Sequence, residues 1–129
     1  MLTSLQQKPR VRCPSRTANS QCARLCRLLA AAVAATFAVP LEEVLAPTRG
    51  SPQAAFARQT AMYLAHVVLG RSVSEIGVLF GRDRTTAAYA CRMIEERRDD
   101  PAIDAVVQLL EELCGELARG FFAGSGVQR

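Results

Sequence analysis

The stretch SVSEIGVLFGRDRTTAAYACRMIEE, residues 72–96, decides the fold. It contains two short helical patterns separated by a tight turn. Ser72 and Glu75 have the spacing of a capping box, in which the serine hydroxyl accepts from a first-turn amide and the glutamate accepts from the serine amide. This spacing predicts a helix that begins near Val73. Gly81 can adopt the left-handed conformation that closes a helix C-terminus, which predicts a sharp turn at this point.

Each of the two predicted helices has an inner face suited to packing. In the first helix, Val73, Ile76 and Phe80 recur at helical spacing, and Gly77 has no side chain to hold a crossing helix away. The carboxylate of Asp83 is expected to cap the second helix. The inner stripe of the second helix consists mainly of small residues: Ala87, Ala90, Cys91 and Ile94. Together these features predict a helix-turn-helix.

The outer face of the second helix has side chains suited to reading a DNA groove. At about 100° per residue, the outward residues are Thr85, Ala88, Tyr89 and Arg92, with Arg84 and Thr86 at their flanks. Arginine donates two hydrogen bonds to a guanine edge, threonine contacts a base edge or a thymine methyl, and alanine lets the helix lie deep. The alternative is an ordinary solvated helix surface. The cap and the turn that precede this helix favour a recognition helix.

A longer stretch, residues 57–96, resembles a known family. It includes RQTAMYLA at residues 58–65 and the whole of the stretch quoted above. These motifs resemble the C-terminal DNA-binding domain of the bacterial chromosomal replication initiator DnaA, with weaker similarity from about Ala23 to Leu117. The resemblance implies an all-α fold, a small helical bundle that contains a helix-turn-helix. Because the sequence has no GxxxxGK[ST] motif, the chain is expected to be a stand-alone DNA-binding domain without the ATPase module of full-length initiators.

The resemblance implies DNA contacts from three parts of the chain. In the loop 46–51, Arg49 matches an arginine that enters the minor groove; the alternative is an ordinary exposed loop charge. In the helix that follows, Arg58 and Gln59 match a pair that contacts phosphate, and helix N-termini favour anions in any case. The other candidates lie in or beside the helix-turn-helix: Ser72, Arg82, Asp83, Arg84, Thr85, Thr86, Tyr89 and Arg92.

Two positions depart from the family pattern. Arg84 stands where the family usually has histidine, and Ala87 where it usually has a bulky aliphatic residue. The resemblance implies that the histidine reads a thymine-rich step of the DnaA box, whereas arginine suits the O6 and N7 atoms of guanine. The predicted partner is therefore double-stranded DNA with a DnaA-box-like site that is altered where Arg84 contacts it. The predicted role is regulation of replication initiation or of transcription.

Charge is distributed unevenly along the chain. The 129 residues have a formal net charge of +4 and a sequence pI of about 9.1. Residues 1–27 carry six basic side chains and no acidic one, whereas residues 99–116 carry six acidic side chains and no basic one. The basic end is expected to attract phosphate. The acidic last helix provides the alternative function, a protein-interaction module that has lost specific DNA reading.

The predicted boundaries follow from caps, prolines and apolar spacing. Residues 1–19 are predicted to be a disordered basic tail, residues 20–119 the DNA-binding domain, and residues 120–129 a frayed tail from which Phe121 and Phe122 can fold back. The first helix is predicted to be capped by Asn19 or Ser20 and to run to about Ala38. The other predicted helices are residues 41–45, 52–69, 73–80, 84–96 and 101–119. In the last helix, the side chains predicted to point inward are Ile103, Val106, Val107, Leu110, Leu113 and Leu117.

No catalytic, cofactor, nucleotide or metal site is predicted. The chain has one histidine, His66, one lysine, Lys8, and no GxxxxGK[ST] motif. Its five cysteines form no CxxC pair, and Cys91 and Cys114 lie on apolar stripes, which favours a reducing cytoplasm. The predicted DNA binding implies a location at the nucleoid. The apolar run 28–39 imitates a secretory signal but is too short to span a bilayer, so no membrane association is predicted.

Overall fold

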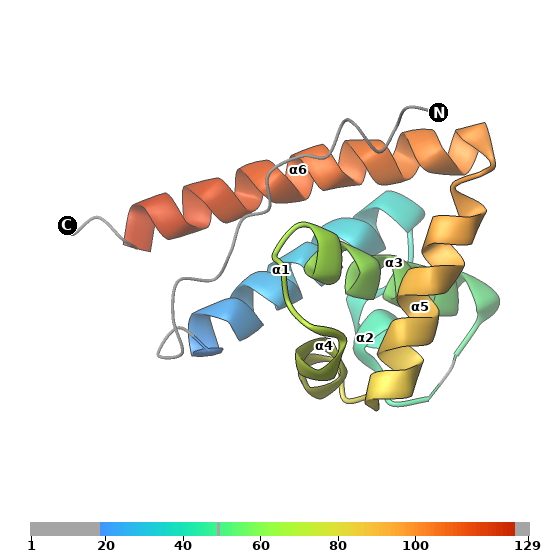
Figure 1. Cartoon of the computed structure of the whole chain (residues 1–129), viewed down its shortest axis with the longest axis horizontal. Helices are drawn as coiled ribbons and strands as arrows, with labels where there is room; N and C mark the ends of the chain where they lie inside the picture. Colours follow the sequence, from blue (N-terminus) through green and yellow to red (C-terminus); the bar gives the residue numbers. More distant parts are fainter. Residues whose placement is uncertain (1–18, 49, 126–129) are drawn as a thin grey trace.

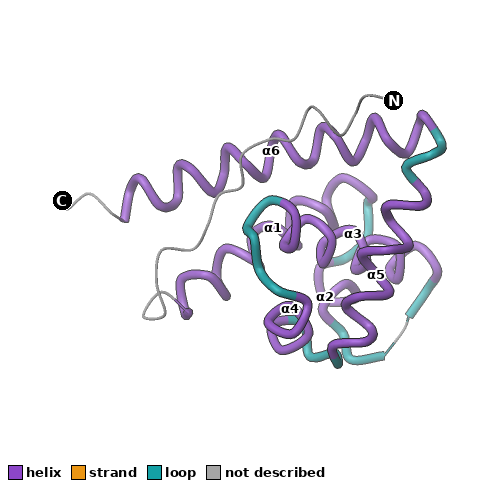
Figure 2. The backbone as a smooth tube through the Cα atoms, viewed as in Figure 1, coloured by secondary structure: helices purple, strands orange, loops and turns teal. Residues whose placement is uncertain are grey.

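The computed structural model describes residues 19–48 and 50–125, which form six α-helices and no strand (Figures 1 and 2). The helices are α1 (Asn19–Phe37), α2 (Leu41–Leu45), α3 (Pro52–Val67), α4 (Val73–Leu79), α5 (Arg84–Arg97) and α6 (Pro101–Ser125). The all-α prediction is confirmed. The basic tail predicted at the N-terminus falls almost entirely outside the described residues.

Helix α3 is the centre of the bundle and contacts all five other helices. It begins where Ser51 and Pro52 predict, because the Ser51 hydroxyl accepts from the Ala54 amide at 3.0 Å and the proline occupies the first turn. Every residue from Thr60 to Ala65 is buried. Several of its buried residues are alanines, which let the neighbouring helices approach closely.

Helix α1 supplies the opposite wall of the core. Leu25 and Leu29 are each 1% exposed and Val33 is fully buried, as expected from their helical spacing. Ala38 adopts a positive φ of 57° after the last turn, and the Val39 amide donates to the Ala34 carbonyl at 2.9 Å. This closes the helix and directs the chain into α2. Within the described ranges, no helix combines the length and apolarity required to cross a membrane.

Helix α6 differs from its prediction in length and in the side that it buries. It continues to Ser125, so the predicted end near Arg119 and the frayed segment after residue 119 are wrong as far as residue 125. Phe121 and Phe122 pack against the core, as the alternative of folding back anticipated, and the Arg24 guanidinium lies 5.9 Å from the Phe121 ring centroid. These contacts give the last turns of α6 a partner on α1.

The inward stripe of α6 is Val107, Leu110, Cys114 and Ala118, all buried. Leu113 and Leu117, predicted to point inward, are 47% and 38% exposed. Two stripes with the same four-residue spacing run one residue apart along this helix: Leu110, Cys114 and Ala118 in one, and Leu109, Leu113 and Leu117 in the other. Spacing alone therefore did not show which stripe is buried. The buried stripe places small side chains against the bundle, which permits close packing of α6.

Arg98 joins three helices at the corner between α5 and α6. Its guanidinium pairs with Asp104 at 2.5 Å and with Glu111 at 2.7 Å, and it donates to the Tyr63 hydroxyl of α3 at 3.0 Å. Burial alone would lower the pKa of Arg98, but these hydrogen bonds outweigh it and raise the pKa. The network fixes the direction in which α6 leaves α5. As Figure 1 shows, α6 lies across one side of the bundle while the N-terminal end of α5 lies at the other.

Candidate nucleic-acid interface

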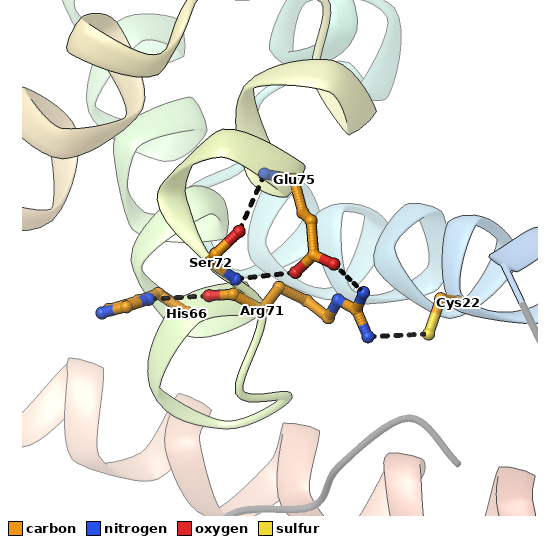
Figure 3. Close-up of polar contacts among 5 residues, drawn as sticks. All are labelled: Cys22, His66, Arg71, Ser72 and Glu75. Carbon is orange, nitrogen blue, oxygen red and sulfur yellow. Dashed lines mark hydrogen bonds and ion pairs between the residues drawn. The ribbon is translucent and has the colours of Figure 1, made fainter. Parts of the chain in front are cut away.

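The start of α4 is fixed by a polar network that reaches α1 and α3 (Figure 3). The Ser72 hydroxyl accepts from the Glu75 amide at 3.1 Å, and the Ser72 amide donates to the Glu75 carboxylate at 2.9 Å, which confirms the capping box. Arg71 pairs with Glu75 at 2.5 Å and donates to the Cys22 sulfur of α1 at 3.8 Å. His66 Nδ1 donates to the Arg71 carbonyl at 2.8 Å. Ser72 is thus engaged as a cap, and its DNA contact stays a prediction.

The turn between α4 and α5 brings two backbones into direct contact. Gly81 has a φ of +67°, the left-handed conformation expected at this position. The Arg82 amide donates to the Gly77 carbonyl at 2.7 Å. A Cβ atom on Gly77 would lie 2.7 Å from the Arg82 carbonyl oxygen, closer than side chains approach backbone. Gly77 is therefore required where the turn folds back on α4.

Asp83 begins α5 as predicted. Its carboxylate accepts from the Thr86 amide at 2.8 Å, and hydrogen bonds from the Thr86 backbone and side chain lower the pKa of Asp83. The inner stripe of α5 is confirmed, because all of its predicted members are buried: Ala87, Ala90, Cys91 and Ile94. This packing fixes which side of α5 faces solvent.

The outward face of α5 consists of the residues that the sequence assigned to DNA reading. All of them are exposed: Arg84, Thr85, Thr86, Ala88, Tyr89 and Arg92. The Arg92 guanidinium lies 5.6 Å from the Tyr89 ring centroid, which orients both side chains on this face. Gln59, on α3, is half-buried. We call the exposed α5 residues the outward face of α5 below.

Arg58 has a structural position that the sequence did not predict. It is 5% exposed, and its Nε donates to the Val44 carbonyl while its Nη2 donates to the Glu43 carbonyl, both at 2.8 Å. Nη2 also lies 3.1 Å from the Thr48 carbonyl oxygen. These bonds satisfy carbonyls at the end of α2, which a helix terminus leaves without internal partners. In this position the side chain supports the loop after α2. The predicted phosphate contact of Arg58 stays a prediction.

Arg82 also turns toward that loop. Its Nη2 donates to the Ala46 carbonyl at 2.8 Å and lies 3.4 Å from the Thr48 carbonyl oxygen. Arg49, the predicted minor-groove residue, lies outside the described residues. The loop-holding bonds of Arg58 and Arg82 left no sequence signal, because a backbone carbonyl can belong to any residue type.

The buried cysteines behave as core residues. Cys26, Cys91 and Cys114 are buried free thiols. Burial raises the pKa of Cys26 and of Cys91 to about 11, and that of Cys114 to about 12, so these thiols stay protonated near neutral pH. In residues 19–48 and 50–125, no three His, Cys, Asp or Glu side chains are placed to hold a metal ion together.

The helix-turn-helix, its N-terminal supports and its exposed outward face match one known family. The family described as Bacterial dnaA protein helix-turn-helix matches residues 26–94, more than half of the chain. The chain belongs to this DnaA helix-turn-helix family. The match runs from α1 to within the last turn of α5, so α6 lies beyond it.

Curated relatives in the DnaA family are much longer proteins. The chromosomal replication initiator protein DnaA of Bartonella quintana is 48% identical over 63 residues, which are 47% of this chain and 13% of the relative. The DnaA of Acinetobacter baumannii is 41% identical over 70 residues, 53% of this chain and 15% of the relative. The DnaA 2 of Chlamydia trachomatis is 35% identical over 71 residues, 55% of this chain and 15% of the relative. The chain thus covers a small fraction of the length of each.

Proposed function

We propose that this chain binds double-stranded DNA at specific sites through the outward face of α5, without enzymatic activity, and so regulates replication initiation or transcription. The observation that carries the proposal is the exposed Arg84, Thr85 and Thr86 at the N-terminal end of a helix whose other side is packed into a helix-turn-helix. Relatives in the family are named as chromosomal replication initiators, which favours a replication site. The cytoplasm, at the nucleoid, is the corresponding location.

In this proposal α5 lies in the major groove with its N-terminal end toward the bases. Arg84 donates two hydrogen bonds to a guanine, and Thr85 and Thr86 contact the neighbouring base edges or a thymine methyl. Tyr89 and Arg92, one and two turns further along, contact the flanking backbone. Gln59 and Ser72 supply further phosphate contacts. The acidic α6 lies on the side of the bundle away from the N-terminal end of α5, so its charge does not oppose this approach (Figure 1).

Selection of bound sequences from a random duplex pool tests the proposal directly. The chain is expected to enrich a DnaA-box-like site with guanine at the position of Arg84. Arg84→Ala should weaken binding by about 1 to 3 kcal/mol and relax selectivity at that one position. Arg84→His should shift the preference back toward the family's thymine-rich step. Arg27→Ala, which removes an exposed arginine from α1, is the matched control and should leave the selected site unchanged.

Salt dependence separates base reading from backbone contact. If Arg49, Arg58, Arg92, Gln59 and the helix N-termini hold phosphates, log affinity should fall with log salt at a slope of magnitude about 3 to 5. If Arg84→Ala weakens every duplex equally and lowers this slope by about 0.9, Arg84 contacts a phosphate and the altered-site hypothesis is wrong. A pool that shows no enrichment contradicts specific DNA binding altogether.

One observation favours a second function, protein binding through α6. Leu109, Leu113 and Leu117 are 66%, 47% and 38% exposed, and they form one stripe, which we call the leucine stripe. No basic residue lies between residues 99 and 118, so the complementary partner is an amphipathic helix with lysine or arginine beside its apolar face.

A synthetic amphipathic peptide of leucine and lysine tests the leucine stripe. Fluorescence anisotropy should show binding that Leu113→Gln weakens and that Gln108→Ala, an exposed change on another side of α6, does not. No binding, or equal binding by both variants, contradicts this function. Concentration-dependent dimerisation in sedimentation would instead identify a second copy of the chain as the occupant.

A further inference from the structure

We propose that Arg82 is a positioning residue that ties the loop after α2 to the turn before α5, so that the two keep a fixed register on DNA. The inference rests on the proposed function. In this role Arg82 does not itself contact DNA, because it acts through the backbone of residues 46–48.

The backbone of Arg82 is held against α4. Its amide donates to the Gly77 carbonyl at 2.7 Å, and its own carbonyl lies against the bare Cα of Gly77. Asp83, the next residue, caps α5. The side chain of Arg82 therefore extends from a point that is rigidly connected to α4 and lies two residues before Arg84.

The side chain of Arg82 ends at backbone carbonyls of the loop after α2. Nη2 of Arg82 donates to the Ala46 carbonyl at 2.8 Å and lies 3.4 Å from the Thr48 carbonyl oxygen. The Thr48 carbonyl also accepts from Arg58, at 3.1 Å. Two guanidinium groups, one from the buried interior of α3 and one from the turn before α5, thus converge on the same loop carbonyl.

Arg58 and Arg82 connect the loop to different parts of the protein. Arg58 is buried and holds the loop to α3 and to the end of α2. It fixes the loop relative to the core. Arg82 adds the connection between the loop and the turn from which α5 begins. An arginine suits this role because its planar fork donates in fixed directions, whereas a lysine ammonium on a flexible stem would hold the same carbonyls with less geometric control.

The connection made by Arg82 would affect how the protein reads DNA. The outward face of α5 is the proposed major-groove reader, and the loop continues directly from Thr48 into the residue predicted for the minor groove. With Arg82 in place, the backbone of residues 46–48 and the outward face of α5 approach DNA as one unit, so less conformational freedom is lost on binding. Without it, Arg58 alone would hold the Thr48 carbonyl, and the loop would keep more freedom to lose on binding.

The test compares Arg82→Ala, Arg82→Lys and Arg92→Ala in the full chain. Hydrogen exchange on the free protein should show faster exchange of the loop amides in Arg82→Ala, above all that of Ala46, which donates to the Glu43 carbonyl at 3.4 Å, with α3 and α5 amides and the thermal melt retained. Affinity for the selected duplex should fall about tenfold, the effect of losing one hydrogen bond to a charged group. Arg82→Lys should recover part of both losses. Arg92→Ala should lower the salt slope and leave loop exchange unchanged.

A result with unchanged loop exchange and a salt slope reduced by about 0.9 in Arg82→Ala would overturn the inference and make Arg82 a phosphate contact. The exchange measurement needs no DNA. If the parent chain binds no duplex, the proposed function fails, and loop exchange still decides whether Arg82 holds the loop. A lysine variant that behaves like alanine in exchange and affinity also counts against a carbonyl-holding role.

Discussion

The helix-turn-helix and α6 both pack through small residues at a helix contact. In the helix-turn-helix the residues that fix this packing are close in sequence, whereas in α6 they are far apart. In α4 and α5 the caps, the turn glycine and the small inner stripe all lie within 25 consecutive residues. In α6 the buried stripe is selected by contacts with α1 and α3, far away in the sequence. A region stabilised by local signals can be described from its own residues, whereas a region stabilised by distant partners cannot.

The largest expected effect is in the helix-turn-helix. Phe80 is 7% exposed and belongs to the core, so Phe80→Ala should lower the free energy of unfolding by about 3 to 5 kcal/mol. Urea unfolding followed by circular dichroism measures this loss. Val78→Ala is the control in the same helix, because Val78 is 81% exposed and its change should stay within about 0.5 kcal/mol. Equal losses would show that the inner face of α4 is assigned incorrectly.

The next effect tests which stripe of α6 is buried. Leu110→Ala should cost about 2 to 5 kcal/mol, because Leu110 is 3% exposed. Leu113→Ala, three residues along, should change stability by at most about 0.5 kcal/mol. Thermal and urea unfolding of the two variants give the difference. The opposite ranking would restore the stripe that the sequence suggested and would remove the leucine stripe from the surface.

The same substitution at two glycines should have opposite signs in the two regions. Gly77→Ala forces a Cβ against the Arg82 carbonyl and should destabilise the protein by about 1 to 3 kcal/mol. Gly115→Ala places its Cβ 3.5 Å from the flexible Arg119 side chain, and should stabilise α6 by about 0.5 to 1 kcal/mol through the lost freedom of the unfolded chain. Two melting curves suffice. A stabilised Gly77→Ala variant would mean that the turn is farther from α4 than described.

The smallest effect is at the cap of α4. Ser72→Ala should cost about 1 kcal/mol, and Ser74→Ala, in the same turn but outside the capping box, much less. The Ser72 amide, and next Arg71, lower the pKa of Glu75 below its ordinary value of 4.5. A carboxyl whose pKa is depressed on folding stabilises the protein above its unfolded pKa and loses that contribution as pH falls through the folded value.

The stability difference between the parent and Glu75→Gln should therefore be full above about pH 4.5 and should disappear at lower pH. Unfolding curves at several pH values between about 2 and 7 measure it. A difference that is independent of pH would show that the glutamate contributes through its hydrogen-bond geometry and not through its charge.

Sequence reasoning reached the start of every helix, because caps and prolines act on their own neighbours. It also separated the inner and outer faces of α5, since only one side of that helix carries small apolar residues. It failed at Leu113 and Leu117, where two apolar stripes have the same spacing. It also did not anticipate the hydrogen bonds of Arg58, whose partners are backbone carbonyls at the end of α2 and in the loop after it, ten and more residues away.

The sequence by itself determined the all-α class, the capping box at Ser72, the glycine turn at Gly81 and the exposed face of α5. Each depends on interactions between residues a few positions apart, where backbone geometry leaves few alternatives. Only the tertiary structure decided which stripe of α6 is buried and that Arg58 and Arg82 turn inward to the loop carbonyls. Those choices depend on which distant surfaces and backbone groups meet in the fold, and a carbonyl has no identity in a sequence.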